Sequence, residues 1–138
     1  MPPVRAYLAL GSNLGNRPAH LALAREELDR TFGIALRGAT AVEETAPLGA
    51  LAQPAYLNQM LAVDTTLSPR ELLEVCHRIE VLAGRTRRAR WESRTLDLDI
   101  VRYGGLTLDE PGLTLPHPGL PDRDFWRRGL DELAASGL

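Results

Sequence analysis

The spacing of apolar positions divides the chain into extended and helical segments. Short apolar runs bounded by turn residues predict strands, and apolar residues recurring every three or four positions predict helices. The predicted strands cover residues 4–10, 34–44, 56–66 and 95–103. The predicted helices lie between Asn16 and Gly33, between Ser68 and Gly84, and over residues 120–133.

The first two predicted helices have recognisable ends. Asn16 is a suitable N-cap and Gly33 a suitable stop for the first. Ser68, followed by proline and by Glu71, forms a capping box for the second, which Gly84 ends. The expected buried faces are Leu21, Ala24, Leu28 and Phe32 on the first helix, and Leu72, Cys76, Ile79 and Ala83 on the second.

The order of these elements is β-α-β-β-α-β, followed by a C-terminal extension that holds an extended stretch (residues 106–115) and the last helix. This order predicts an α+β fold with a ferredoxin-like βαββαβ core, in which the helices pack on an antiparallel sheet. A chain of 138 residues suits one domain, so residues 1–138 are expected to form a single unit.

Composition places the chain among ordinary globular proteins, with 44% hydrophobic and 25% charged residues. A net charge of −2 gives no reason to expect nucleic-acid or membrane binding. Cys76 is the one cysteine, which excludes an internal disulfide, and it is expected to be an inert core thiol. No signal peptide or 18-residue apolar run is visible, and a cytoplasmic protein is expected.

All sixteen basic residues are arginines. The absence of lysine excludes a lysine Schiff base and a Walker A lysine. Anions must therefore be held by arginine, histidine, backbone amides or a metal. Coding bias is the simplest reason for the missing lysines, but the positions of the arginines remain informative.

Five arginines fall within residues 85–94, directly before the sequence Leu96-Asp97-Leu98-Asp99-Ile100. On a strand, Asp97 and Asp99 share one face while the apolar residues take the other. Two adjacent carboxylates are a ligand set for Mg²⁺, and the arginines could hold phosphates. A solvated run of charges, with both aspartates paired to arginines and no metal, is the alternative interpretation.

Two further segments offer binding groups. Tyr56 and Asn58 share a strand face, where an aromatic ring beside an amide suits a planar heterocycle. His117 lies between two prolines that fix its backbone. Either segment could instead serve packing alone.

Together these segments resemble the 6-hydroxymethyl-7,8-dihydropterin pyrophosphokinase family of folate biosynthesis. The resemblance covers almost the whole chain. It rests on Gly84-Arg85-x-Arg87, Arg90-Trp91 and Arg94-Thr95-Leu96-Asp97-Leu98-Asp99-Ile100, with Leu10-Gly11-Ser12-Asn13, Thr45-x-Pro47-Leu48-Gly49, Gln53-Pro54-x-Tyr56-Leu57-Asn58 and Leu115-Pro116-His117-Pro118 in support.

The resemblance implies a cytoplasmic, ATP- and Mg²⁺-dependent transferase that moves pyrophosphate from ATP to the hydroxymethyl group of the pterin and releases AMP. Two Mg²⁺ ions are expected on Asp97 and Asp99. The implied catalytic residues are Arg85, Arg94, Asp97 and Asp99. The implied pterin-binding residues are Thr45, Leu48, Tyr56, Asn58, Trp91 and Phe125. The implied nucleotide-binding residues are Glu80, Arg87, Arg88, Arg90, Ile100, Thr114, His117 and Arg123.

Three positions depart from the family pattern: Glu92-Ser93 replace a common Gly-Pro, and His77 replaces a common glutamine. The general base is open between Asp97 and metal-assisted loss of the proton to water. An RNA-binding module and an inactive relative used for protein contacts are the alternative classes; the negative charge and the 5% aromatic content argue against the first. A monomer that binds neither nucleic acid nor membrane is expected.

Overall fold

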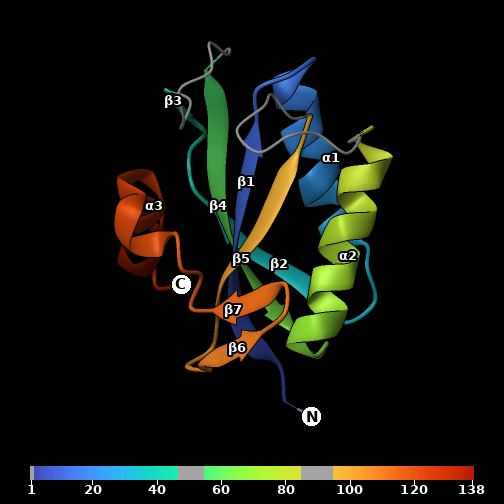
Figure 1. Cartoon of the computed structure of the whole chain (residues 1–138), viewed down its shortest axis with the longest axis vertical. Coiled ribbons are helices and arrows are strands. Elements are labelled where there is room, and N and C mark those ends of the chain that lie inside the picture. The colour runs from blue at the N-terminus through green and yellow to red at the C-terminus, as the bar shows by residue number, and fades with distance from the viewer. Residues whose placement is uncertain (1, 47–54, 85–94) are drawn as a thin grey trace.

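A five-stranded sheet runs through the middle of the molecule, with helices on both of its faces (Figure 1). The computed structural model describes residues 2–46, 55–84 and 95–138. The strand order is β2-β4-β1-β5, β3 also pairs with β4, and every pairing is antiparallel. The strands are β1 (Val4–Ser12), β2 (Ile34–Ala39), β3 (Glu43–Thr45), β4 (Tyr56–Thr65) and β5 (Asp97–Tyr103).

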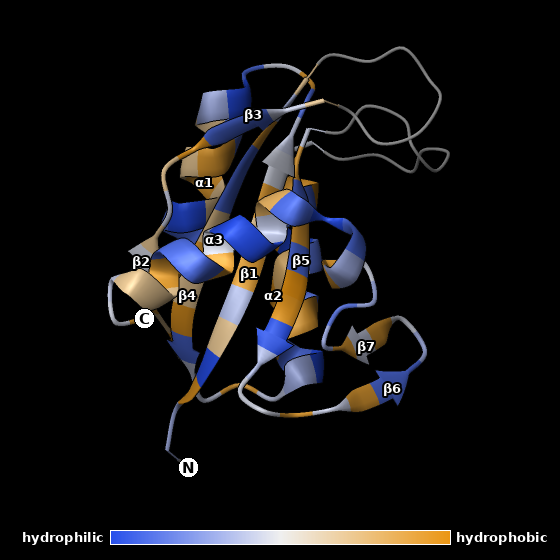
Figure 2. Cartoon of the chain, turned by 90° about the vertical axis from the view of Figure 1, so that its left-hand side faces the viewer, coloured by the Kyte–Doolittle hydropathy of each residue, from blue (hydrophilic) through white to orange (hydrophobic). Residues whose placement is uncertain are grey.

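The helices make this a three-layer arrangement. The crossover helices α1 (Arg17–Asp29) and α2 (Pro69–Leu82) cover one face of the sheet, and α3 (Asp124–Ala135) lies across the other (Figures 1 and 2). Between β5 and α3 the chain forms a small hairpin of β6 (Leu108–Glu110) and β7 (Leu113–Leu115), then a 3-10 turn at Leu120–Asp122. The predicted ferredoxin-like core is confirmed, and the C-terminal extension supplies the third layer.

Each face of the sheet has its own hydrophobic cluster. The larger lies under α1 and α2 and contains Leu8, Leu61 and Leu98 from three adjacent strands. The smaller lies under α3, where Ala9, Met60 and Val101 meet Trp126 and Leu130. In Figure 2 the outward side of α3 is hydrophilic, as expected for a helix that covers a sheet with one apolar stripe.

The predicted ends of the helices are largely confirmed. The Asn16 side chain accepts a hydrogen bond from Ala19 N at the start of α1, and Ser68 and Glu71 form the capping box of α2. Gly84 follows α2 with a φ of +83°, a conformation that favours glycine. Cys76 is fully buried, and desolvation raises the pKa of its thiol, so it is the expected inert core residue.

The prediction for Phe32 is wrong. Its side chain is 96% exposed, although its spacing placed it on the buried face of the first helix. The reason is that α1 ends at Asp29, whose carboxylate then accepts a hydrogen bond from Leu36 N in β2. Phe32 therefore lies in the turn before Gly33, where helical spacing no longer decides which way a side chain points.

The predicted strand over residues 34–44 is interrupted. β2 ends at Ala39, and the pairing with β4 resumes at Glu43. Between them, Ala41 N turns away from the sheet and donates to Glu132 of α3. At the same end of the sheet, β1 runs on to Ser12, so Gly11 belongs to the strand, which the sequence predicted to end at residue 10.

None of the helices in the described parts of the chain combines the length and the apolar character needed to cross a bilayer.

Candidate functional site

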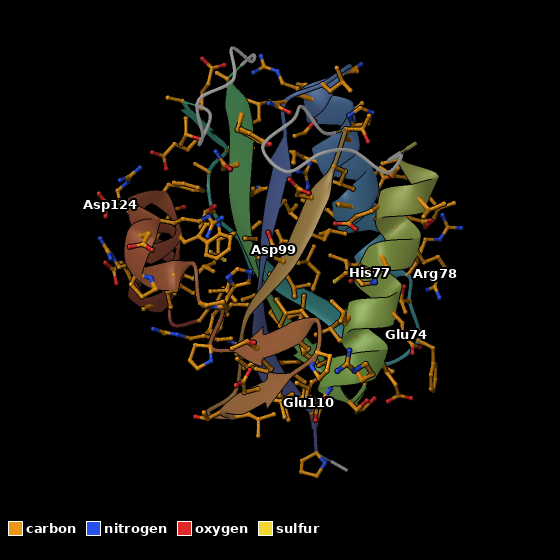
Figure 3. All side chains as sticks on the ribbon, in the orientation of Figure 1. Glu74, His77, Arg78, Asp99, Glu110 and Asp124 are labelled. Atoms are coloured by element: carbon orange, nitrogen blue, oxygen red, sulfur yellow. The ribbon has the colours of Figure 1, made fainter. Side chains whose placement is uncertain are left out.

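The two aspartates lie on the sheet face that α3 covers. Asp99 pairs with Ala9 of β1, and Asp97 pairs with Gly11. Leu98 and Ile100 alternate with them and are each 3% exposed in the core on the opposite face. The predicted alternation along this strand is therefore confirmed, and Figure 3 shows Asp99 on β5 near the centre of the molecule.

Gly11 links the aspartates to the predicted ring-binding residues. It pairs with Asp97 on one side and with Asn58 on the other, so these three residues form one row across β5, β1 and β4. Two strand spacings separate Asp97 from Asn58, which is about 10 Å between backbones. Because Gly11 has no side chain, the side chains of Asn58 and Tyr56 can lie close to the middle of this row.

A cavity of about 540 Å³ lies above this row and extends around the edge of β5 toward α2. This volume suits a small organic ligand or two adjoining ones. Its lining includes Gly11, Thr45, Tyr56, Asn58, His77, Glu80, Asp97, Asp99, Ile100, Thr114, His117, Arg123, Phe125 and Trp126.

One end of the cavity combines aromatic rings with hydrogen-bonding side chains, which suits a flat molecule with polar groups along its edge. Asn58 Nδ2 donates to Thr45 Oγ1 at 2.5 Å, so the two side chains form one hydrogen-bonding edge. The Tyr56 ring lies beside Gly11, since a Cβ added there would be 3.5 Å from Tyr56 Cδ1. Phe125 enters from α3, with its ring edge-on to Trp126 at 6.3 Å between centroids.

His117 stands on the other side of the aspartates, after a cis Leu115–Pro116 peptide. Its Nδ1 accepts a hydrogen bond from Gly119 N at 2.9 Å, and its Nε2 lies 3.6 Å from Asp99 Oδ1. The bond from Gly119 leaves the proton of a neutral ring on Nε2, facing the carboxylate. The ring also packs edge-on against Trp126 at 4.9 Å.

Arg123 and Trp126 line the cavity next to His117. The guanidinium carbon of Arg123 lies 4.6 Å from the centre of the Trp126 ring, a cation–π contact. Trp126 thus supports His117 on one side and Arg123 on another. Trp126 was not among the site residues predicted from the sequence, although its place directly after Phe125 could have indicated that it lies near the site. Gly11 was not among them either, although its place at the end of a buried strand is typical of close approach by a ligand.

Glu80 joins α2 to the outer edge of β5. It is 7% exposed, and its Oε2 accepts a hydrogen bond from Leu98 N at 2.9 Å. His77 lies one turn earlier on α2 and faces the same cavity, while Arg78 points outward (Figure 3). Thr114 lines the far side, where its hydroxyl donates to Asp109 at 3.2 Å.

The donor chemistry of this cavity fits a hard divalent cation. Asp97 and Asp99 offer carboxylate oxygens on one face of one strand. In the described parts of the chain, no three His, Cys, Asp or Glu side chains gather around one point. Two carboxylates can still bind Mg²⁺ when substrate phosphates and water supply the other ligands, which is the usual arrangement for this ion.

Seven predicted site residues lie outside the described residues. They are Leu48, Arg85, Arg87, Arg88, Arg90, Trp91 and Arg94. The other eleven all line the cavity described above: Thr45, Tyr56, Asn58, Glu80, Asp97, Asp99, Ile100, Thr114, His117, Arg123 and Phe125.

The chain is similar to a family of known proteins. The family described as 7,8-dihydro-6-hydroxymethylpterin-pyrophosphokinase (HPPK) matches residues 7–135. Among curated proteins, the 2-amino-4-hydroxy-6-hydroxymethyldihydropteridine pyrophosphokinase of Methylorubrum extorquens is 43% identical over 94% of this chain and 82% of its own. The proteins of the same name from Bacillus subtilis and Haemophilus influenzae are each 38% identical, over 93% and 96% of this chain and 77% and 82% of their own.

A match over nearly the whole chain, together with relatives well above 30% identity, leaves one assignment: the chain belongs to the 7,8-dihydro-6-hydroxymethylpterin-pyrophosphokinase family.

Proposed function

We propose that this protein is an ATP- and Mg²⁺-dependent transferase that moves pyrophosphate from ATP to the hydroxymethyl group of 6-hydroxymethyl-7,8-dihydropterin, with release of AMP, in folate biosynthesis. One observation carries the proposal. A single cavity holds an aromatic and amide end at Tyr56, Asn58 and Phe125, and next to it a paired-carboxylate centre at Asp97 and Asp99.

The aromatic end is where the pterin would bind. Tyr56 and Phe125 would stack on the two faces of the ring, and the Thr45–Asn58 pair would hydrogen-bond its edge. From there the hydroxymethyl group would point past Gly11 toward Asp97. The family resemblance adds Leu48 and Trp91 to this end.

The nucleotide would occupy the part of the cavity that rounds β5. Glu80, Ile100 and Thr114 line the side toward α2 and the hairpin, and His117 and Arg123 line the side toward α3. An arginine and a histidine beside two carboxylates suit a metal-bound polyphosphate. The resemblance adds Arg87, Arg88 and Arg90 as nucleotide ligands, and Arg85 and Arg94 as catalytic arginines.

Asp97 and Asp99 would hold two Mg²⁺ ions, which supply neutralisation of the phosphate charge. The protein's own task is then mainly positioning. The hydroxymethyl oxygen attacks the β-phosphorus of ATP, the bond between the α–β bridging oxygen and that phosphorus breaks, and AMP leaves. The hydroxyl proton passes to Asp97 or to water.

The proposal also includes the number of domains, the oligomeric state and the location of the protein. Both hydrophobic clusters pack on one sheet, and residues of that sheet, of both helix layers and of the β6–β7 hairpin line the same cavity, which supports treating residues 1–138 as a single catalytic domain. We propose that the protein acts as a monomer in the cytoplasm.

The decisive experiment incubates the purified protein with ATP, Mg²⁺ and hydroxymethyldihydropterin and separates the nucleotides. We expect AMP and the pterin diphosphate in equal amounts, with no product when Mg²⁺ is chelated. Formation of ADP, or AMP without the pterin diphosphate, would contradict the proposed reaction.

A further inference from the structure

Arg17 connects three segments that are far apart in the sequence. It is the first residue of α1, and its side chain is 30% exposed. Its Nη1 donates to the backbone oxygen of Ala55 at 2.8 Å and to Glu44 Oε2 at 3.2 Å. One guanidinium nitrogen therefore holds β3 and the residue just before β4 at the same time.

These contacts lie on the side of the sheet opposite to the cavity. Glu44 pairs with Leu57, which packs against the cluster under α1 and α2. Paired residues on neighbouring strands share a face, so Glu44 points toward α1. Thr45 pairs with Tyr56, and both line the cavity on the α3 side. Arg17 can thus influence the cavity only through the backbone of β3 and β4.

β3 needs such support because it is three residues long and follows an interruption of the sheet. A matching contact holds it from the other face, where Arg128 of α3 pairs with Glu43. Consecutive glutamates on one short strand thus each bind an arginine from the helix layer that they face. Between them, these arginines fix the strand that carries Thr45.

We propose that Arg17 is a positioning residue for the ring-binding end of the site. By joining Glu44 to the Ala55 carbonyl, it keeps Thr45 where its hydroxyl meets the Asn58 amide. This inference rests on the proposed function, which makes the Thr45–Asn58 pair the edge that recognises the pterin. It predicts an effect on the pterin and none on ATP, whose groups lie beyond the aspartates.

Arg17 is expected to contribute little to the free energy of unfolding, in contrast to its proposed effect on the position of Thr45. Glu44 is 60% exposed, and ion pairs at such exposed positions contribute little to the free energy of unfolding. A loss of positioning without a loss of folding is therefore measurable. It separates a role in the site from a merely structural one.

The test measures Michaelis constants for both substrates in wild type, Arg17→Ala and Arg17→Lys. We expect Arg17→Ala to raise the KM for the pterin about tenfold, equivalent to about 1.4 kcal/mol, with the KM for ATP and the melting temperature nearly unchanged. Arg17→Lys should recover part of the loss, because an ammonium group can still donate to the Ala55 carbonyl or to Glu44.

Arg30→Ala is the matched control. Arg30 caps the other end of α1 and pairs with Glu27 of the same helix, so its removal should leave both KM values unchanged. Equal pterin KM values for Arg17→Ala and Arg30→Ala, or a parallel rise in both KM values, would overturn the proposal. If Arg17→Ala does not fold, Glu44→Ala decides, with an expected rise of about threefold in the pterin KM alone.

The failure of this inference can be told apart from failure of the proposed function. A wild-type protein without turnover would contradict the proposed function. In that case the effect of Arg17→Ala is measured on pterin binding by ligand fluorescence. Unchanged affinity there would overturn the positioning role.

Discussion

Among single residues, Asp97 and Asp99 occupy positions where charge is costly to the fold. Aspartate is depleted in strands, and both residues present carboxylates to the same face of β5. Their neighbours Leu98 and Ile100 fill the core from the same strand. One seven-residue strand thus carries core packing on one face and ligand chemistry on the other.

Replacing Asp99 by asparagine tests whether the ligand face of β5 can lose a charge without loss of core packing on the other face. Asp99→Asn keeps the shape but removes a proposed Mg²⁺ ligand, so we expect turnover to fall by at least about two orders of magnitude. The melting temperature without Mg²⁺ should stay the same or rise, because one of two like charges is gone. Steady-state assays and thermal melts measure both quantities.

The control for this change is Asp131→Asn, at an exposed position on the outer side of α3. It should alter neither quantity. A fully active Asp99→Asn enzyme, or equal losses of activity in the two variants, would show that Asp99 does not bind the metal.

Individual residues were predictable where strand or capping rules are local. The alternation around Asp97 follows from the two-residue period of a strand, and the Ser68–Glu71 capping box from a spacing of three. Phe32 was not predictable in this way. Its exposure depends on where α1 stops, and that end is stabilised by a bond from Asp29 to Leu36 on the next strand.

Among the elements, α3 determines the shape of the cavity. It brings Phe125 and Trp126 to the sheet face that carries the aspartates. Gly129 allows the close approach, because a Cβ at this position would lie 2.8 Å from Met60 Cβ. The turn of α3 that follows Phe125 therefore rests almost directly on β4.

Gly129→Ala should push α3 away from the sheet. Overpacking costs about 1–3 kcal/mol, while alanine gains about 1 kcal/mol in helix propensity, so a net loss of about 1 kcal/mol in the free energy of unfolding is expected. The KM for the pterin should also rise, since Phe125 lies one turn away. Urea denaturation and steady-state kinetics measure these effects.

Gly105→Ala is a suitable comparison, because a Cβ at Gly105 meets nothing within 4 Å. It should be neutral in both measurements. If Gly129→Ala is as stable as Gly105→Ala and keeps its pterin KM, the close contact with Met60 does not set the position of α3.

The helices and most strands could be predicted from local patterns. The long-range contacts between these elements could not. The sequence indicated one strand over residues 34–44. Its interruption depends on Ala41 donating to Glu132, a residue 91 positions later. The placement of α3 over the cavity likewise depends on contacts between segments that no short pattern joins.

In the whole molecule, one group of contacts ties the last helix to the first strand. The backbone oxygen of Leu138 accepts hydrogen bonds from Arg5 and Tyr7 of β1. Arg5 also binds Asp64 of β4 at 2.6 Å, and Arg37 lies 3.3 Å from the same carboxylate. Three strands and the segment after α3 meet at this point.

This group predicts a pH dependence of stability. The hydrogen bond from Arg5 is the main cause that holds the pKa of Asp64 below its usual value of 3.8. A lowered folded-state pKa stabilises the protein above the unfolded-state pKa, and this stability is lost as the pH falls through the folded-state value. The sign is therefore a loss of stability in acid.

Asp64→Asn should lower the free energy of unfolding by up to about 1 kcal/mol at neutral pH, since the group is partly exposed. The difference from wild type should shrink as the pH falls below 3.8, where Asp64 becomes protonated. Urea denaturation across this range tests the claim. A difference that stays constant with pH would mean that the charge of Asp64 contributes nothing.

The two hydrophobic clusters have a further consequence for how such an enzyme can change. The larger cluster under α1 and α2 joins the four longer strands to both crossover helices, whereas the residues that line the cavity come mainly from the other face. Substitutions of lining residues outside the smaller cluster under α3 therefore leave the larger cluster unchanged. An engineer seeking a different heterocycle could vary positions 45, 56, 58 and 125 as a library and expect most members to fold. In this scaffold, the proposed ring-binding positions and the larger hydrophobic cluster lie on opposite sides of the same sheet.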